Sequence, residues 1–353
     1  MALRTFTCTD FRCLVSVSLE PDPRCNLIYG PNASGKTSLL EAIAYLGRGK
    51  SFRGAPAESL VRHEASEFVL FGKAHTGFRE VALGVRNGSA GLEISVDGER
   101  GGGAASLASV LPLQIVDPEV HNLVAGGPEY RRRYLDWLAF HVEHGYPDLW
   151  RRFRRALRQR NAALRAGATS GLKSWDIEFA ELALAVDQAR QRALTRALSH
   201  LEGVGSRLLG SVVAFEYRQG WAAGRSLLDT LSASVERDLQ TGSTAAGPQR
   251  ADLRLICDQR QARKLVSRGQ QKLLACSMIL AATRVAQAEL ERPLLLLLDD
   301  PAAELDVRSL DLLMAEVADL ESQVIATALQ DNTNLFAGPT ALFHVERGVL
   351  VTR

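Results

Sequence analysis

A short segment near the N-terminus has the residue types and spacing of a phosphate-binding loop, Gly-x4-Gly-Lys-Ser/Thr. In such a loop the glycines let backbone N–H groups turn toward a phosphate, the lysine bridges two phosphates, and the hydroxyl binds Mg²⁺. The alternative is an ordinary turn before a helix, but a chance match to the whole pattern in a chain this long has a probability on the order of 1%. We therefore predict nucleotide binding, with a catalytic lysine, by Gly30, Pro31, Asn32, Ala33, Ser34, Gly35, Lys36, Thr37 and Ser38.

A leucine run ending in two carboxylates has the features of the second half of a nucleotide site. Leu294–Leu298 is typical of a buried strand, and Asp299 and Asp300 follow it. We expect this strand to lie beside the strand that leads into the phosphate loop, with Asp299 holding Mg²⁺ directly or through water. Asp300 would then face the γ-phosphate, where a carboxylate orients or deprotonates the attacking water. Without the phosphate loop, a leucine-rich strand ending in a solvated Asp would be a weak signal.

A third motif opens a predicted helix over residues 270–290. It consists of Ser267, Arg268, Gly269 and Gln270. A hydroxyl residue and a glycine at a helix N-terminus can bind an anion through backbone N–H groups and the helix dipole. The alternative is that Ser267 simply caps the helix. Because residues 38–293 separate the two halves of the nucleotide site, a large insertion is expected between them.

Together the three motifs resemble the ATP-binding-cassette family. That resemblance implies an ATP-dependent homodimer in which the Ser-x-Gly-Gln signature of one subunit closes on the nucleotide of the other. It also implies a dimer-seam loop at Glu304, Leu305 and Asp306, and a role for Gln114 in sensing Mg²⁺ and coupling the insertion to the site. Thr327 stands where transporter-type cassettes place a switch histidine. With Asp300 in place of Glu, this indicates slow hydrolysis.

Within that family the chain is similar to the RecF family of DNA replication and repair proteins, from Leu3 to near Arg347. The resemblance implies a dimer that clamps duplex, gapped or junction DNA when ATP binds and releases it on slow hydrolysis. It further implies RecO and RecR as mediator partners, loading of the RecA recombinase, and a link to the SOS response. Cys13 and Gln249 depart from the family pattern, which has Asn and His there. The matching segments are residues 10–12, 37–43, 50–53, 126–136, 159–164, 247–252 and 299–306.

The elements that must position these motifs are of two kinds. Alternating or β-branched segments predict strands over residues 3–9, 14–20, 25–29, 68–74, 80–85, 92–96, 111–116 and 212–217, the fourth to sixth forming an antiparallel meander. Helical periodicity predicts helices over residues 34–47, 129–144, 149–166, 174–209 and 227–239, with a loop at 166–171. The fold class is therefore α/β: an ABC-type P-loop ATPase head, with a mixed sheet, helices and an antiparallel meander, and an inserted, mainly helical second domain. We place the head at residues 1–117 and 245–353 and the insertion at 118–244.

The basic residues are unevenly distributed. Of 42 Lys and Arg residues, only six are Lys, and arginines are dense between residues 131 and 165. Such a cluster can contact DNA phosphates without reading sequence. The alternative is a solvated helix face. The candidate DNA contacts are Arg131, Arg132, Arg151, Arg152, Arg155 and Arg158.

Composition limits the remaining classes. The chain has 46% hydrophobic and 23% charged residues and a net charge of +2. This composition is typical of an ordinary globular protein. Its longest aliphatic run, Leu294–Leu298, is far short of the roughly 20 residues of a membrane span. The N-terminus lacks a secretory signal, and five cysteines without a Cys-x-x-Cys pair argue against a disulfide framework or a zinc site, so we expect a cytoplasmic protein with no membrane partner. The competing classes are a phosphotransferase, which has no use for the signature motif, and the energy subunit of a transporter.

Overall fold

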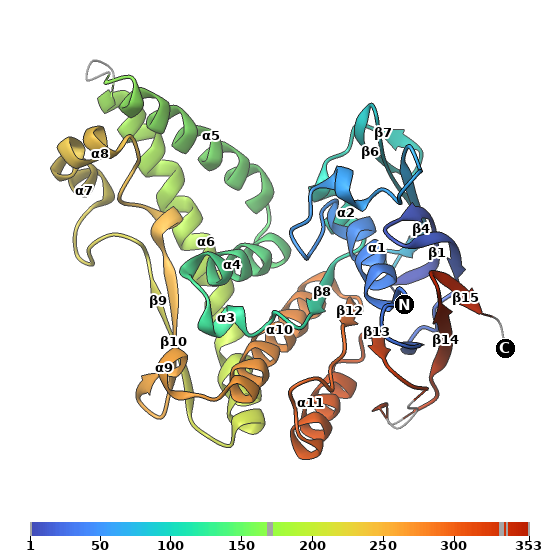
Figure 1. Cartoon of the computed structure of the whole chain (residues 1–353). Coiled ribbons are helices and arrows are strands. Elements are labelled where there is room, and N and C mark those ends of the chain that lie inside the picture. Colours follow the sequence, from blue (N-terminus) through green and yellow to red (C-terminus); the bar gives the residue numbers. More distant parts are fainter. Residues whose placement is uncertain (1, 168–171, 332–334, 337, 352–353) are drawn as a thin grey trace. The chain divides into compact units, whose positions relative to one another are not determined.

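The computed structural model describes residues 2–167, 172–331, 335–336 and 338–351 (Figure 1). The chain divides into two compact units. The first comprises Met1–Val120 and Ala286–Arg353, and the second comprises His121–Val285.

The second unit is larger than the insertion expected at 118–244. It also takes in residues 245–285. The physical reason is the pairing of β10 (Asp252–Cys257) with β9 (Val213–Arg218), which are antiparallel along their whole length. Backbone hydrogen bonds therefore join residues after 245 to the helical part of the chain, and the expected boundary at 244/245 is not where the compact units meet.

The first unit contains an antiparallel sheet with the strand order β2-β1-β4-β5-β6-β7. Its strands are β1 (Leu3–Phe11), β2 (Leu14–Leu19), β4 (Phe68–His75), β5 (Glu80–Gly88), β6 (Gly91–Val96) and β7 (Glu99–Arg100). Alternate residues are buried along β4, and along β1 and β2 every second or third residue is buried, so one face of the sheet packs into the core and the other meets solvent. The predicted meander over residues 68–96 is confirmed as β4, β5 and β6.

The main sheet of the first unit has the strand order β15-β14-β3-β13-β12-β8. Its strands are β3 (Cys25–Tyr29), β8 (Leu113–Val116), β12 (Leu295–Leu298), β13 (Gln323–Ala328), β14 (Ala341–Glu346) and β15 (Val349–Val351). All neighbours are parallel except β14 and β15. The order corrects one prediction: β13 lies between β3 and β12, so the strand that ends in Asp299 is not beside the strand that leads into the phosphate loop.

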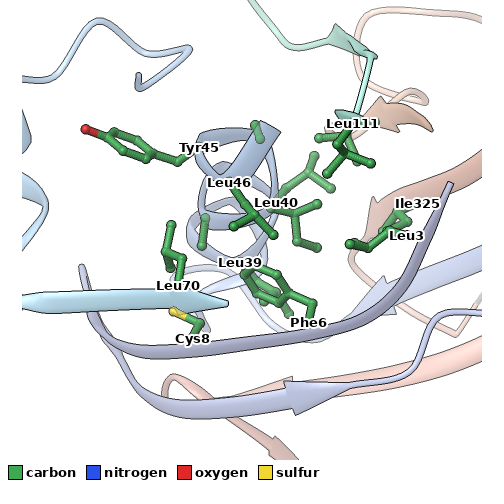
Figure 2. Close-up of a cluster of buried hydrophobic side chains, with 14 of the residues drawn as sticks. Leu3, Phe6, Cys8, Leu39, Leu40, Tyr45, Leu46, Leu70, Leu111 and Ile325 are labelled. Carbon is green, nitrogen blue, oxygen red and sulfur yellow. The ribbon is translucent and has the colours of Figure 1, made fainter. Parts of the chain in front are cut away.

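Helix α1 (Lys36–Arg48) forms the centre of the hydrophobic core of this unit. Every residue from Leu39 to Gly47 is buried, as expected for a helix covered by a sheet on both sides. Figure 2 shows leucines of α1 among side chains of both sheets: Leu39, Leu40 and Leu46 with Phe6, Leu70 and Ile325. The other helices of the unit are η1 (Ala57–Leu60), α2 (Ala104–Val110) and α11 (Val307–Asp319).

The second unit is mainly helical. Three long helices carry it, α4 (Pro128–Val142), α5 (Tyr146–Arg165) and α6 (Leu172–Leu209), at the predicted places. Residues 168–171 of the predicted loop lie outside the described residues. The shorter elements are α3 (Asn122–Ala125), α7 (Leu227–Ala233), α8 (Val235–Thr241), η2 (Pro248–Arg250), β11 (Arg260–Gln261) and α9 (Ala262–Leu265), and α10 (Arg268–Leu290) crosses into the first unit.

One helix prediction in this unit is wrong. Residues 227–239 do not form a single helix, because the chain leaves the helical path at Ser234 (φ −101°, ψ 4°) between α7 and α8. The N–H of Ser234 bonds back to the carbonyls of Thr230 and Leu231 and so closes the last turn of α7. The hydroxyl of Ser234 also donates to the carbonyl oxygen of Leu231 at 3.3 Å, and serine side chains disfavour helix interiors because they compete for backbone groups in this way.

Helix α10 is the one helix, within the described part of the chain, that is long and apolar enough to cross a membrane. Of its most apolar window, 72% is buried inside the protein. A buried core helix of a soluble protein has these properties, and the apolar surface of α10 is accounted for by packing.

Candidate functional site

The phosphate loop joins β3 to α1 and depends on glycine for its shape. Gly30 (φ 153°) and Gly35 (φ 111°) both adopt backbone angles that L side chains avoid. A Cβ atom on Gly30 would also lie 2.2 Å from the carbonyl oxygen of Val345. The loop can therefore bring its backbone N–H groups together only with glycine at these places.

Lys36 lies folded over the loop. Its Nζ donates hydrogen bonds to the carbonyl oxygens of Gly30 and Pro31, at 2.8 Å each. Burial lowers the pKa of Lys36, and the nearby carboxylates of Asp300 and Asp299 oppose that shift. The amine is thus held between the two halves of the site, where a phosphate group can replace the carbonyls as its partner.

Asp299 connects the two halves of the nucleotide site, the phosphate loop and the end of β12, through hydrogen bonds. Its Oδ1 accepts a hydrogen bond from Thr37 Oγ1 at 3.0 Å and another from Thr327 Oγ1 at 2.8 Å. The residue is only 4% exposed. Burial raises its pKa, whereas the two hydroxyl bonds lower it. A carboxylate and a hydroxyl oxygen side by side are the donors that Mg²⁺ prefers, so Thr37 and Asp299 fit a magnesium ion.

A pocket of about 320 Å³ gathers these residues. It joins the phosphate loop to the ends of β12 and β13, which are far away in the sequence. Cys13, Arg53 and Thr327 line it without having been predicted as site residues, although Arg53 ends a segment that carries the family resemblance, which was a usable signal. The full lining is Cys13, Asn32, Ala33, Ser34, Gly35, Lys36, Thr37, Ser38, Arg53, Asp299, Asp300, Thr327, Ala328 and Leu329.

The expected role of Gln114 needs correction. Its side chain is buried and accepts a hydrogen bond from Arg48 at 3.5 Å, and it does not line the pocket. The reason is register: Gln114 pairs with Leu296, two residues before β12 ends. Asp117 instead follows the end of β8, as Asp299 follows the end of β12. Burial and the charge of Asp299 raise the pKa of Asp117 to about 6.

The signature residues begin α10 in the second unit. The N–H of Ser267 donates to Gln270 Oε1 at 2.9 Å, and the N–H of Gln270 donates to Ser267 Oγ at 3.3 Å. This reciprocal pair is a capping box, so the helix-cap alternative describes what Ser267 does in the isolated chain. Arg268 and Gly269 form the first turn between them. The motif stays exposed at the surface of its unit, and its action on a second subunit stays a prediction.

The predicted seam loop, Glu304 to Asp306, begins four residues after Asp300. Glu304 has a left-handed backbone (φ 66°), and Leu305 is half-buried. Asp306 caps α11 by accepting a hydrogen bond from the N–H of Ser309 at 2.8 Å, and the bonds from Ser309 lower the pKa of Asp306. The next residue, Val307, is 78% exposed. An apolar side chain is therefore exposed at the start of α11, directly after the predicted seam loop.

Comparison with known proteins identifies the family. The model of the RecF/RecN/SMC N terminal domain matches residues 2–348. The DNA replication and repair protein RecF of Azotobacter vinelandii is 40% identical over 358 residues, which cover 99% of this chain and 98% of that protein. The chain belongs to the RecF family.

Solved structures agree with this assignment. The recombination mediator protein RecF-ATP in the RecFOR pathway is 25% identical and superposes with a TM-score of 0.89, covering 99% of this chain and 97% of that one. The Smc head domain of Pyrococcus furiosus, at 14% identity and a TM-score of 0.62, shares the fold over 99% of this chain and 95% of its own. This member of the RecF family thus has the predicted fold, an ABC-type ATPase head.

The arginines of the cluster do not all lie on one surface. Arg131 was predicted to contact DNA, and the structure contradicts that prediction. Arg131 is only 5% exposed. Its guanidinium donates to both carboxylate oxygens of Asp252, at 2.7 and 3.2 Å, and to the carbonyl oxygen of Gly126. Those bonds tie α4 to β10, so Arg131 is not available to DNA. Arg132 is half-buried and donates to the carbonyl oxygen of Ala251.

The other four candidates lie exposed on α5. Arg151, Arg155 and Arg158 are spaced i, i+4 and i+7, so they share one face, with Arg152 beside them. The opposite face of α5 is buried. Arg151 pairs with Asp148 at 2.8 Å, but both side chains are about three-quarters exposed and the pair is weak. We call Arg151, Arg152, Arg155 and Arg158 the α5 arginine face.

A feature absent from the prediction of the site is the C-terminal hairpin of β14 and β15. The N–H of Gly348 in its turn donates to the carbonyl oxygen of Ser34 in the phosphate loop at 2.8 Å. Gly348 has φ 79°, and a Cβ atom there would lie 2.1 Å from the carbonyl oxygen of Cys13. The hairpin thus supports the loop from behind, through a contact that only glycine permits.

Substituting Gly348 by Ala is expected to weaken nucleotide binding as well as stability. The left-handed backbone costs roughly 1–2 kcal/mol for any L side chain, and the added methyl group must push the hairpin off the loop. Gly91→Ala is the matched control, because Gly91 has φ 87° and nothing within 4 Å of its Cβ position. Denaturation should show a loss for both variants, and nucleotide titration a loss for Gly348→Ala alone. Equal behaviour of the two variants in both assays would contradict the role of the hairpin.

Proposed function

We propose that this chain is an ATP-dependent DNA-binding protein of recombinational repair and replication. ATP closes a homodimer on duplex, gapped or junction DNA, and slow hydrolysis opens it again. The observation that carries the proposal is the hydrogen bond that Thr37 Oγ1 of the phosphate loop donates to Asp299 Oδ1. This bond joins the two halves of an ATP site. Full-length similarity to RecF proteins and to RecF-ATP supports the same conclusion.

The pocket supports binding of ATP with Mg²⁺. Backbone N–H groups of the loop and Lys36 bind the phosphates, and Thr37 with Asp299 would hold the ion, which neutralises phosphate charge when bound. Asp300 orients the water that attacks the γ-phosphate, and Arg53 adds a second cation to the pocket. With Asp in place of Glu and Thr327 in place of a histidine, hydrolysis is slow and serves as a timer.

Dimer closure completes the site. Ser267 and Gly269 of one subunit reach the nucleotide of the other. The capping box fixes the first turn of α10 by using the N–H groups of Ser267 and Gln270, and the N–H of Gly269 together with the helix dipole then faces the phosphate. The exposed Val307 and the loop from Glu304 to Asp306 form the seam. A phosphotransferase has no use for a signature motif that closes on the nucleotide from a second subunit, which disfavours that class.

The α5 arginine face is the surface proposed to contact DNA phosphates. The protein acts in the cytoplasm. Its partners in loading the RecA recombinase are mediator proteins of the RecO and RecR type. The SOS response is then linked to it through the recombinase. Because the contacts are to phosphates, binding falls steeply with salt and is independent of base sequence.

The experiment that tests the proposal is fluorescence anisotropy of a labelled gapped duplex, with and without ATP and Mg²⁺. ATP is expected to tighten DNA binding of the wild-type protein by about 5–150-fold, the usual range of coupling between two sites. Ser267→Arg, which blocks the seam, should lose this response. Ser232→Arg is the matched control, because Ser232 is an exposed serine on α7 in the same unit.

A mass measurement checks the dimer independently. Light scattering of the slowly hydrolysing Asp300→Asn variant should show a doubled mass on adding ATP. If ATP changed neither the DNA affinity nor the mass, the proposed ATP-dependent clamp would be wrong, and only the proposed nucleotide binding would stand.

A further inference from the structure

Thr327 occupies a decisive place in the main sheet. It lies near the end of β13, the strand between β3, which leads into the phosphate loop, and β12, which ends in the two acids. Its backbone pairs with Ile28 of β3, and it is 1% exposed. Its side chain therefore fills the gap between the two halves of the nucleotide site.

The hydroxyl of Thr327 makes one hydrogen bond to each of the two aspartates. It donates to Asp299 Oδ1 at 2.8 Å and accepts from the backbone N–H of Asp300 at 2.9 Å. The directions follow from chemistry, since an ionised carboxylate can only accept and an N–H can only donate. The methyl group of a valine could fill the same space but could make neither bond.

Each bond has a separate consequence. The bond to Asp299 holds the same oxygen that accepts from Thr37, so the carboxylate is aimed at the hydroxyl that would share its metal ion. The bond to Asp300 fastens a backbone with φ 49°, a left-handed conformation that L residues adopt rarely. Asp300 lines the pocket in this conformation.

We propose that Thr327 is the positioning residue for both acids of the nucleotide site, acting through the carboxylate of Asp299 and the backbone of Asp300. A switch histidine would contact the nucleotide; Thr327 instead acts on the residues that hold the ion and the water. The inference rests on the proposed function, because it needs ATP and Mg²⁺ to bind in this pocket.

The test compares Thr327→Val, which keeps the shape, with Thr327→Ser, which keeps the hydroxyl. A fluorescent ATP analogue is titrated with Mg²⁺ and again with the ion chelated. Loss of a residue that orients a metal ligand weakens metal-dependent binding by about 10–100-fold. We expect that loss for Thr327→Val only with Mg²⁺ present, and near-wild-type binding for Thr327→Ser.

Thr283→Val is the matched control for burial. Thr283 is 0% exposed, and its hydroxyl donates to the carbonyl oxygen of Ile279 within α10. It should share any general loss of melting temperature while keeping Mg²⁺-dependent binding. A double-variant cycle adds a second measurement: with Asp299→Asn, Thr327→Val should cause no further loss of Mg²⁺-dependent binding, because the group it aims has gone.

The outcomes separate two failures. Additive losses in the cycle, or equal Mg²⁺-dependent binding by wild type and Thr327→Val, would overturn the role of Thr327 and leave the proposed function standing. Absence of nucleotide binding by the wild-type protein would overturn the proposed function and this inference together.

Discussion

Replacing Arg151, Arg155 and Arg158 together by glutamine is expected to weaken duplex DNA binding by several hundredfold at about 0.1 M salt. Each arginine that neutralises a phosphate contributes a salt slope of roughly 0.9, so three contacts account for a factor of about 500 between 1 M and 0.1 M salt. The three residues span roughly 10 Å along α5, the length of about three base pairs.

The measurement is the affinity for a labelled duplex at several salt concentrations. The plot of log affinity against log salt should become shallower by about 2.7 for the triple glutamine variant. Substitution of the same three residues by lysine should keep the wild-type slope. Exposed arginines of the same unit, Arg218 and Arg254 on β9 and β10, provide the matched control, and their glutamine variants should change the slope little.

An unchanged slope in the triple glutamine variant would show that this face is only solvated. Because nucleotide binding involves none of these residues, the same variants should titrate ATP as the wild type does. Loss of ATP binding would point to misfolding of the variant rather than to a lost DNA contact.

Replacing Arg160 by Met is expected to be among the most damaging single changes in the second unit. Arg160 is fully buried and donates to Asp176 at 2.7 Å, and to Asp238 and Thr244 at 2.8 Å each. Methionine fills a similar volume but leaves two buried carboxylates without their cation. Breaking a buried pair in this way costs about 3–5 kcal/mol of the free energy of unfolding.

Denaturant titration measures that loss, with Arg158→Met as the control. Arg158 lies two residues earlier on α5 and is exposed, so its substitution should change the free energy of unfolding by less than about 0.5 kcal/mol. If Arg160→Met were as mild as Arg158→Met, water would have to reach Asp238, which is 0% exposed. The pair of variants therefore separates the structural arginine of α5 from its surface arginines.

The local parts of the site could be predicted from the order of residues along the chain. Residues 30–37 form a phosphate loop because the required glycines, lysine and threonine are contiguous, and their spacing alone decides which backbone groups converge. The helices α4, α5 and α6 were predictable for the same reason, since helical periodicity depends on neighbouring residues. Asp299 was predictable from the apolar strand that precedes it.

The way in which these parts come together depends on contacts between distant segments and could not be predicted. Strand order depends on pairing between segments distant in the chain, so the place of β13 between β3 and β12 left no local signal. That order is what brings Thr327 to both acids and leaves Gln114 short of the pocket. Burial of Arg131 against Asp252 is equally non-local, because an arginine on a helix has the same local pattern whether it faces solvent or a carboxylate on another element.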